Sequence, residues 1–323
     1  MDTLLAGLRA AGEHTRLRIL ALCARGELSV SELVQILGQS QPRVSRHLKL
    51  LVEAGLLERI PEGAQVFFRL AHEDSAARLA RALVELLPVA DAVLSRDFSR
   101  LDQVRDARAK KAQDYFGRVA DSWDSIRSLY VPQREFEDKL LEIVGDEAVY
   151  ELLDIGTGTG RILEILSPRV HRGIGIDLSN DMLTVARSNL ERSGYINVHV
   201  RKGDMYCLPI DDASVDLAIV HMVLHYSDDP LEVIREAARV LRPGGRLIVI
   251  DFAAHTLEKL RSEFNHHRLG FSDNEIRKCF NAAHLKSESA VENLVGDPLT
   301  VSFWQARKAA GVQALRPARA SSG

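Results

Sequence analysis

Residues 149–160 carry the feature that most limits what this chain can fold into. Val149–Ile155 is an apolar run of strand length that leads into three closely spaced glycines, Gly156, Gly158 and Gly160, and then into a segment with helical spacing. Glycine adopts backbone conformations that other residues avoid, and it lets a ligand approach the main chain closely. A strand, a glycine-rich turn and a helix in this order predict a nucleoside-binding turn in an α/β sheet.

The strand and helix pattern continues through the carboxyl-terminal half of the chain. After the first strand we predict four more apolar strands and two helices between them. Buried strands that alternate with helices are typical of a mostly parallel, doubly wound sheet, so this half is predicted to be α/β and Rossmann-like. The predicted strands are 173–177, 198–200, 215–220 and 246–251, and the helices are 181–190 and 230–241.

Acidic residues stand at the ends of the first three strands. Asp154 comes just before the glycines, Asp177 ends the second strand, and Asp204 follows the third beside Met205. The GxGxG spacing differs from the GxGxxG of dinucleotide folds, which disfavours a bound pyrophosphate. A carboxylate at Asp177 can accept both ribose hydroxyls, and Asp204 can accept from an adenine amino group.

Residues 1–72 follow a different pattern, which predicts a helix, a helix-turn-helix and a hairpin. Ser31 is the predicted N-cap of the second helix, and Ser40 caps the third, with Pro42 in its first turn, where a missing N–H costs least. Two strands, 57–60 and 65–70, flank a turn at 61–64. This order is that of an α+β winged helix-turn-helix.

The third helix is predicted to read DNA. Val44, Leu48 and Leu51 form its apolar back, and the remaining side chains are polar donors that can meet bases or phosphates. The net charge of −3 means that any contact with DNA must come from a local basic face. The alternative is a solvated basic helix on a domain that binds a partner protein. The predicted DNA contacts are Gln41, Arg43, Ser45, Arg46, His47 and Lys49 on the helix and Arg59, Gln65 and Arg69 on the hairpin.

Residues 73–111 are predicted to be two helical segments that meet near Pro88. They suit a dimer contact and a bridge between the domains, but the polar stretch 96–111 could instead be a solvated connector, and the sequence does not decide between the two. We predict that the α/β domain covers 112–307 and that 308–323 is a disordered tail.

Bulk features exclude several classes of protein. No run of 18 apolar residues is present, and the first residues lack the pattern of a signal peptide, so we expect neither a membrane segment nor secretion. The three cysteines, Cys23, Cys207 and Cys279, show no pairing or metal-ligand spacing. This favours a reducing cytoplasm, and we expect no bound metal.

Residues 9–72 resemble the ArsR-type winged-helix repressors, most strongly in 40–51 and in the closing 67–70. The resemblance implies a homodimer on an inverted-repeat operator in double-stranded DNA, with release when a ligand binds. Ser29 and Ser31 stand where related repressors carry metal-binding cysteines. Because a hydroxyl is a poor substitute for a thiolate, metal sensing through that site is not expected.

Residues 112–307 resemble the Rossmann-like methyltransferases that use S-adenosylmethionine, in particular the UbiE-like branch. The glycine turn, the acidic strand ends and 241–245 (Leu-Arg-Pro-Gly-Gly) carry the resemblance. It implies that S-adenosylmethionine or S-adenosylhomocysteine is bound, and that a final strand at 299–305 is antiparallel. The implied contacts are Gly156, Gly158 and Gly160 at the methionine portion, Asp154 at its amino group, Asp177 and Leu178 at the ribose, Asp204 and Met205 at the adenine, His221 after the fourth strand, and Tyr115, Phe116, Trp123 and Tyr130 in a lid or, alternatively, in the core.

Catalytic residues are weakly indicated. His221 and His225 follow the fourth strand, where a histidine can act as a base near pH 7, although structural roles are also open. Two hypotheses follow. In the first, the chain is a regulator whose effector is one of the two nucleosides, with methionine and methyl-cycle genes as targets. In the second, it is a methyltransferase for a small-molecule acceptor that also regulates its own operon.

Overall fold

A computed structural model describes residues 1–62, 65–71, 74–88, 90–107, 110, 132–264, 266–288 and 291–310 of the 323-residue chain. These residues form two compact units. The aromatic side chains predicted to form a lid, the tip of the hairpin at 63–64 and the chain from 311 onward lie outside the described residues.

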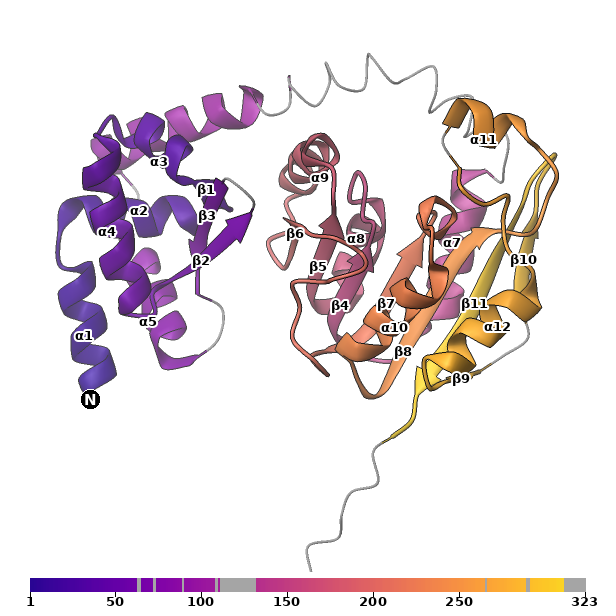
Figure 1. Ribbon diagram of the computed structural model, residues 1–323. Coiled ribbons are helices and arrows are strands. Elements are labelled where there is room, and N and C mark those ends of the chain that lie inside the picture. Colours follow the sequence, from indigo (N-terminus) through magenta and orange to yellow (C-terminus); the bar gives the residue numbers. More distant parts are fainter. Residues whose placement is uncertain are drawn as a thin grey trace, which may run out of the picture. The chain divides into compact units, whose positions relative to one another are not determined.

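The amino-terminal unit is a winged helix-turn-helix (Figure 1). Helices α3 and α4 form the helix-turn-helix, and β2 and β3 form the antiparallel wing. A short strand that the sequence pattern did not reveal, β1, pairs with β3 through Leu28 opposite Phe68. The α+β prediction for this unit is confirmed. Its elements are α1 (Asp2–Ala11), α2 (His14–Cys23), β1 (Leu28–Ser29), α3 (Val30–Leu37), α4 (Gln41–Glu53), β2 (Leu57–Glu62), β3 (Gln65–Leu70) and α5 (Asp74–Glu85).

The start of α3 corrects one prediction. The N-cap is Ser29 rather than Ser31, because Ser29 and Glu32 form a reciprocal capping box. A capping box needs a glutamate or glutamine three residues after the cap, and Val34 stands at that position for Ser31. Ser40 is the N-cap of α4 as predicted, but its side chain makes no capping hydrogen bond among the described residues.

The segment after the wing is helical, with α5 followed by a helix over 92–107. Asp97 in the second helix is buried and forms two hydrogen bonds with the guanidinium of Arg18 in α2, at 2.6 and 2.8 Å. Leu101 and Val104 belong to the apolar core of the amino-terminal unit. This helix is therefore part of that core rather than a solvated connector, and its role in a dimer stays a prediction, as do the domain boundaries.

The carboxyl-terminal unit is built on a mostly parallel sheet of eight strands with the order β10-β11-β8-β7-β4-β5-β6, and β9 pairs with β11 (Figure 1). Strands β4 to β8 are parallel, and β11 is antiparallel to β8, so the predicted Rossmann-like class is confirmed. The strands are β4 (Val149–Ile155), β5 (Val170–Asp177), β6 (Val198–Lys202), β7 (Val215–His221), β8 (Leu241–Phe252), β9 (Leu285–Ser287), β10 (Glu292–Val295) and β11 (Thr300–Lys308).

Helices connect these strands. The predicted helix that was expected to end at 241 ends at Val240, because Leu241 is already extended and begins β8. The helical elements are α7 (Gln133–Val144), α8 (Arg161–Leu166), η1 (Ser167–Arg169), α9 (Asn180–Ser193), η2 (Leu224–Tyr226), α10 (Pro230–Val240), α11 (Lys259–Phe264) and α12 (Asp273–Ala282). Within the described residues, no helix combines the length and apolar character needed to cross a membrane.

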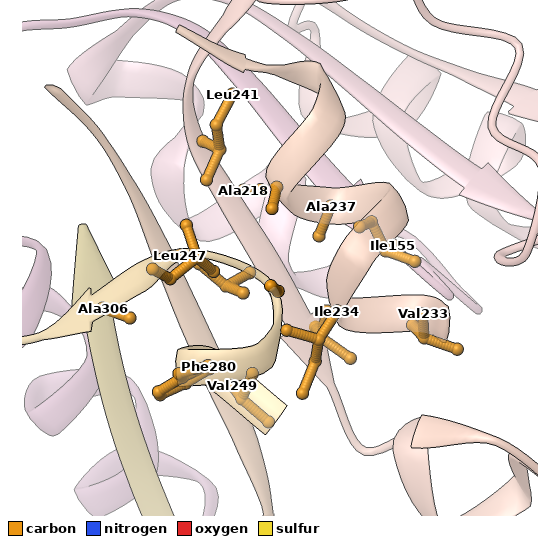
Figure 2. Packing of buried hydrophobic residues seen from close by; sticks show 14 of the residues in the cluster. Ile155, Ala218, Val233, Ile234, Ala237, Leu241, Leu247, Val249, Phe280 and Ala306 are labelled. Carbon is orange, nitrogen blue, oxygen red and sulfur yellow. The ribbon is translucent and has the colours of Figure 1, made fainter. Parts of the chain in front are cut away.

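The side chains of successive strand residues point to opposite faces, and the two faces of this sheet are covered by different helices. On one face Ile155, Leu247 and Val249 pack against α10 and α12, as Figure 2 shows for Ile234 and Phe280. On the opposite face Phe303 of β11 stacks on Phe136 of α7, so α7 covers this part of the sheet. Helices cover both faces of the sheet. In such open α/β sheets ligands bind beyond the carboxyl ends of the parallel strands, so a ligand site is expected there.

Candidate functional site

The glycine turn leaves β4 in a conformation that requires glycine. Gly156, Gly158 and Gly160 have φ angles of 72°, 53° and 81°, in the left-handed region. The turn is tied to β5, because the N–H groups of Gly156 and Thr157 both donate to the carbonyl of Ile176. A Cβ added at Gly158 would meet no described atom within 4 Å, so this part of the turn faces open space that a ligand can use.

Asp154 at the end of β4 is the most unusual charged group in this region. It is fully buried, and its Oδ2 accepts a hydrogen bond from Thr157 Oγ1 at 2.5 Å. Its Oδ1 is also buried and has no hydrogen-bond partner among the described residues. Burial raises the pKa of Asp154 to about 7; the hydrogen bond from Thr157 lowers it, and the charge of Asp177 raises it further. A buried carboxylate oxygen without a hydrogen-bond donor costs free energy. A ligand that brings a cationic or N–H group would satisfy Oδ1 of Asp154.

This arrangement fits an adenosyl amino acid. Asp154 would accept a hydrogen bond from the ligand's ammonium, and the glycine turn would hold its methionine or homocysteine portion. The acceptors also suit a nucleoside, because the carboxylate of Asp177 ends β5 and that of Asp204 follows β6, where they can accept from ribose hydroxyls and an adenine amino group. No group of three or more histidine, cysteine, aspartate or glutamate side chains within the described residues could hold a metal ion.

The side chains predicted for ribose and adenine lie on the strand ends beside the glycine turn. Asp177 Oδ2 accepts from the N–H of Gly158 at 2.8 Å, which fixes the carboxylate next to the turn. Leu178 is 65% exposed, and Met205 packs partly against the core. Asp204 is exposed and accepts from the N–H of Tyr206 at 3.0 Å. Since β4, β5 and β6 are neighbours, the sheet brings Asp154, Asp177 and Asp204 to one edge.

His221 ends β7 on the face that α7 covers. Its ring stacks on Phe136, with ring centroids 4.8 Å apart, and Phe136 in turn stacks on Phe303. Burial lowers the pKa of His221 to about 4, so the ring is neutral and a weak base at pH 7. The role of His221 as a catalytic base therefore receives no support from its surroundings, and its contact with a cofactor stays a prediction.

His225 lies in η2 and is held by a buried carboxylate. Its Nδ1 is 2.8 Å from Oδ1 of Asp251, and the two side chains are 3% and 0% exposed. Sequence reasoning named His225 but missed Asp251, the residue that orients it. The available signal was that Asp251 lies near the carboxyl end of β8, the strand next to β7 in the sheet.

Three further residues shape the glycine turn and were not singled out from the sequence. Thr157 donates to Asp154, and it fits because Gly175 on β5 has no side chain; a Cβ there would lie 2.5 Å from Thr157 Oγ1. Val223, in the loop after β7, packs against Gly156, where a Cβ would lie 2.6 Å from the valine side chain. Such contacts depend on the spacing between strands, which the sequence does not show.

Helix α4 presents the predicted DNA-reading face. Its three apolar residues are buried, whereas Gln41, Arg43, Ser45, Arg46 and Lys49 are exposed. His47 differs, because it is half-buried and its Nδ1 is 3.7 Å from Glu13 at the N-cap of α2. Burial lowers the pKa of His47, an effect that Glu13 opposes. His47 thus faces its own unit rather than solvent.

The wing residues are placed differently from one another. Arg59 is exposed on β2, and the side chain of Gln65 lies outside the described part of the chain. Arg69 is buried and is paired with Glu58 at 2.6 Å and with Glu27 at 3.5 Å. Because these carboxylates engage the Arg69 guanidinium inside the unit, we retain Arg59 and not Arg69 as the candidate phosphate contact.

Comparisons with known proteins agree with this architecture. Residues 13–59 match the family model of bacterial regulatory proteins of the arsR family, and residues 153–249 match a methyltransferase domain. The chain therefore joins an ArsR-type helix-turn-helix to a Rossmann-like methyltransferase domain.

Individual relatives match part of the chain. It is 34% identical over 119 residues to the uncharacterized methyltransferase YcgJ of Bacillus subtilis, which covers 37% of this chain and 47% of that protein. It is 28% identical over 160 residues to the demethylmenaquinone methyltransferase of Lactococcus lactis, which covers 48% and 64%. The crystal structure of YcgJ has a TM-score of 0.50 at 23% identity and covers 55% of this chain and all of that one. The chain thus spans less than two thirds of the length of either curated relative, and the structural likeness shows the fold.

Proposed function

We propose that this protein is a homodimeric, DNA-binding regulator whose methyltransferase-type domain binds S-adenosylmethionine or S-adenosylhomocysteine as an effector. The expected targets are methionine and methyl-cycle genes, and the expected effect is repression. Such a regulator works in the cytoplasm, where it has access to the chromosome. The observation that carries the proposal is that one chain combines an exposed, polar recognition helix with a buried carboxylate that lacks a donor at a glycine turn.

The recognition helix supports the DNA-binding part of the proposal. Arg43 and Arg46 are exposed on α4, and neither forms an ion pair within the described residues. An arginine can donate two hydrogen bonds to a guanine edge, and Gln41 can do the same at adenine. Exposed side chains on a helix with a buried apolar back are what docking in the major groove requires.

The nucleoside site supports the effector part. Both nucleosides carry the ammonium that Asp154 lacks and the ribose that Asp177 can accept from. An effector changes operator affinity only if it binds the two conformational states of the regulator unequally. A coupling of about 1–3 kcal/mol would change operator affinity about 5- to 150-fold.

A binding-site selection tests this proposal without knowledge of the operator. Random double-stranded DNA is selected on the full chain, and the enriched duplex is titrated by fluorescence anisotropy at fixed salt with each nucleoside at saturation. We expect an inverted repeat and a change in Kd with at least one nucleoside. Unchanged Kd with both, in a protein that binds them by calorimetry, would reject the effector role.

Methyl transfer is the second candidate function. It is supported by the glycine turn and the carboxylates of Asp154 and Asp177, which suit a methyl donor of this kind, and by the relatives named above, which include a demethylmenaquinone methyltransferase. When bound, S-adenosylmethionine would supply an electrophilic methyl group, and this chain would hold and orient it. Incubation of the protein with a tritium-labelled methyl donor and cell extract tests this function, and the absence of any labelled product from a protein that binds the donor would count against it.

A further inference from the structure

Four polar side chains meet beyond the carboxyl ends of β7 and β8, and we name them the histidine cluster: His225, Asp251, His255 and His266. The ring of His266 stacks on that of His225, with centroids 4.0 Å apart and an interplanar angle of 25°. His225, Asp251 and His266 are 3%, 0% and 1% exposed. Neither the effector role nor the methyl transfer proposed above involves this cluster.

The hydrogen bonds fix the ring orientation of His225. A carboxylate can only accept, so Nδ1–H of His225 donates to Asp251. Asp251 also accepts from the backbone N–H of His225 at 3.2 Å and from that of Phe252 at 2.8 Å. Three donors therefore satisfy this buried carboxylate, and removal of its charge would disturb both the ring and the backbone of η2.

The rings beside His225 are held in the neutral form. Burial lowers the pKa of His266 to about 4, and burial also lowers that of His255. Both ring nitrogens of His266 and Nε2 of His255 are buried without a hydrogen-bond partner in the described chain. Among the described residues, the other titratable groups near the cluster include His221 from β7, Tyr226 from η2 and Glu258, whose charge acts on His255. A proton on His266 would place a charge where burial opposes it more strongly than the charge of Asp251 favours it, and where no described residue accepts a hydrogen bond from the ring.

The cluster holds the loop that lies on the glycine turn. The backbone carbonyl of His225 accepts from the N–H groups of His267 and Arg268, at 3.0 and 3.1 Å. Two residues before His225, Val223 packs against Gly156. Residues 222–228 are thus fixed by Asp251 from β8 and by the segment that carries His266, and the fixed loop covers one side of the candidate nucleoside site.

We infer that the histidine cluster is a clasp, in which Asp251 and His225 hold residues 222–228 against the glycine turn and acid releases them, so that nucleoside affinity falls as His266 takes up a proton. Asp251 and His225 are positioning residues here, since they act on the site through the loop. The inference rests on the nucleoside binding proposed above.

The direction and size of the effect follow from His266. The ordinary pKa of histidine is near 6.5, and in the closed state that of His266 is lowered to about 4. The contribution of His266 to closure is therefore fully present above pH 6.5 and is lost as the pH falls toward 4. If release returns the ring to its ordinary pKa, this residue alone weakens the affinity at pH 5.5 by up to about tenfold relative to pH 7.5, and the full factor applies when the released loop dominates the ligand-free protein. Titration of Asp154 adds its own pH dependence, but this is common to all variants with Asp154 intact.

The test compares S-adenosylhomocysteine binding at pH 7.5 and pH 5.5, by calorimetry, in the full chain and in two histidine variants. His266→Phe keeps an aromatic ring in the stack and removes the proton site. His284→Asn is the matched control, because His284 is exposed and has a positive φ of 58° that asparagine tolerates. We expect the natural chain and His284→Asn to lose more affinity in acid than His266→Phe does, by up to about tenfold.

A second measurement follows the loop directly. Hydrogen exchange of peptides covering 222–228, corrected for intrinsic rates, should speed up at pH 5.5 in the natural chain and not in His266→Phe; Asp251→Asn should show fast exchange already at pH 7.5. Equal pH dependence in the natural chain and His266→Phe would overturn the clasp while leaving nucleoside binding intact. If S-adenosylhomocysteine fails to bind at either pH, the proposed function fails, and the clasp fails with it.

Discussion

Asp154→Asn gives a prediction in which stability and binding move in opposite directions. Burial raises the pKa of Asp154 from 3.8 to about 7, and each unit corresponds to 1.36 kcal/mol. The folded protein without ligand therefore loses up to about 4 kcal/mol of stability from this group as the pH rises from 4 to 7. This cost is fully present at pH 8 and only about 2 kcal/mol of it is present at pH 5.

Asparagine removes the charge but introduces a new polar group. Its carbonyl oxygen can keep the hydrogen bond from Thr157, and its amide then lies where Oδ1 has no donor to accept from. A buried amide without a partner costs about 1–3 kcal/mol. We expect the variant without ligand to be about 1–3 kcal/mol more stable than the natural protein at pH 8 and near equal at pH 5.

Binding should respond in the reverse sense. The asparagine NH2 is a donor and cannot accept a hydrogen bond from the ammonium of S-adenosylhomocysteine, and loss of a hydrogen bond to a charged group costs about 1.5–3 kcal/mol, or roughly 10- to 150-fold in affinity. Urea unfolding at pH 5 and pH 8 and calorimetry at pH 8 measure the two effects, with Asp211→Asn on an exposed loop as the control. A variant that is less stable at pH 8 and binds within twofold of the natural protein would refute the reasoning on Asp154.

Three other changes test separate parts of the account. Arg43→Ala should weaken binding to the selected duplex by about 1–3 kcal/mol in anisotropy titrations, whereas Arg69→Met should leave DNA contacts alone and change the free energy of unfolding, since its ion pairs are internal. Ser29→Ala removes the capping box and should lower the free energy of unfolding by about 1 kcal/mol, measured in urea. Gly158→Ala should cost about 1 kcal/mol of stability through its positive φ and abolish calorimetric heat with either nucleoside, because the methyl group enters the open space; unchanged binding would place the ligand elsewhere.

The sequence predicted the fold of both halves because their signals are local. Strand-length apolar runs alternate with helical spacing from Val149 onward, and every predicted strand is present in the sheet. The antiparallel closing strand was implied by the family resemblance, and β11 confirms it. Strand β1, of two residues, is too short for a periodic pattern, and only the pairing of Leu28 with Phe68 reveals it.

Site residues could be predicted where the residue type and its place after a strand indicate the role. They could not be predicted where the role depends on a contact made in the folded protein. The glycines and the acidic strand ends can be read from the chain, since their conformations and positions follow from the order of strand and turn. Asp251 and Val223 were missed because β8 and β7, which carry them to the site, are neighbours of β4 only in the folded sheet. Thr157 lies within the turn, and its role shows only in its hydrogen bond to the buried carboxylate of Asp154. For the same reason Arg69 was taken for a DNA contact, although Glu27 and Glu58 engage it.

The central claim is that occupancy of the nucleoside site is felt at the DNA. The direct measurement is the Kd of the selected duplex at fixed salt, with and without saturating S-adenosylhomocysteine, in the natural chain and in Asp154→Asn. At a nucleoside concentration that fills the natural chain and leaves the weaker-binding variant largely empty, we predict a change of at least about fivefold in the natural chain and none in the variant. Equal Kd values with and without the nucleoside in the natural chain, at concentrations where calorimetry shows the site to be full, would contradict the account.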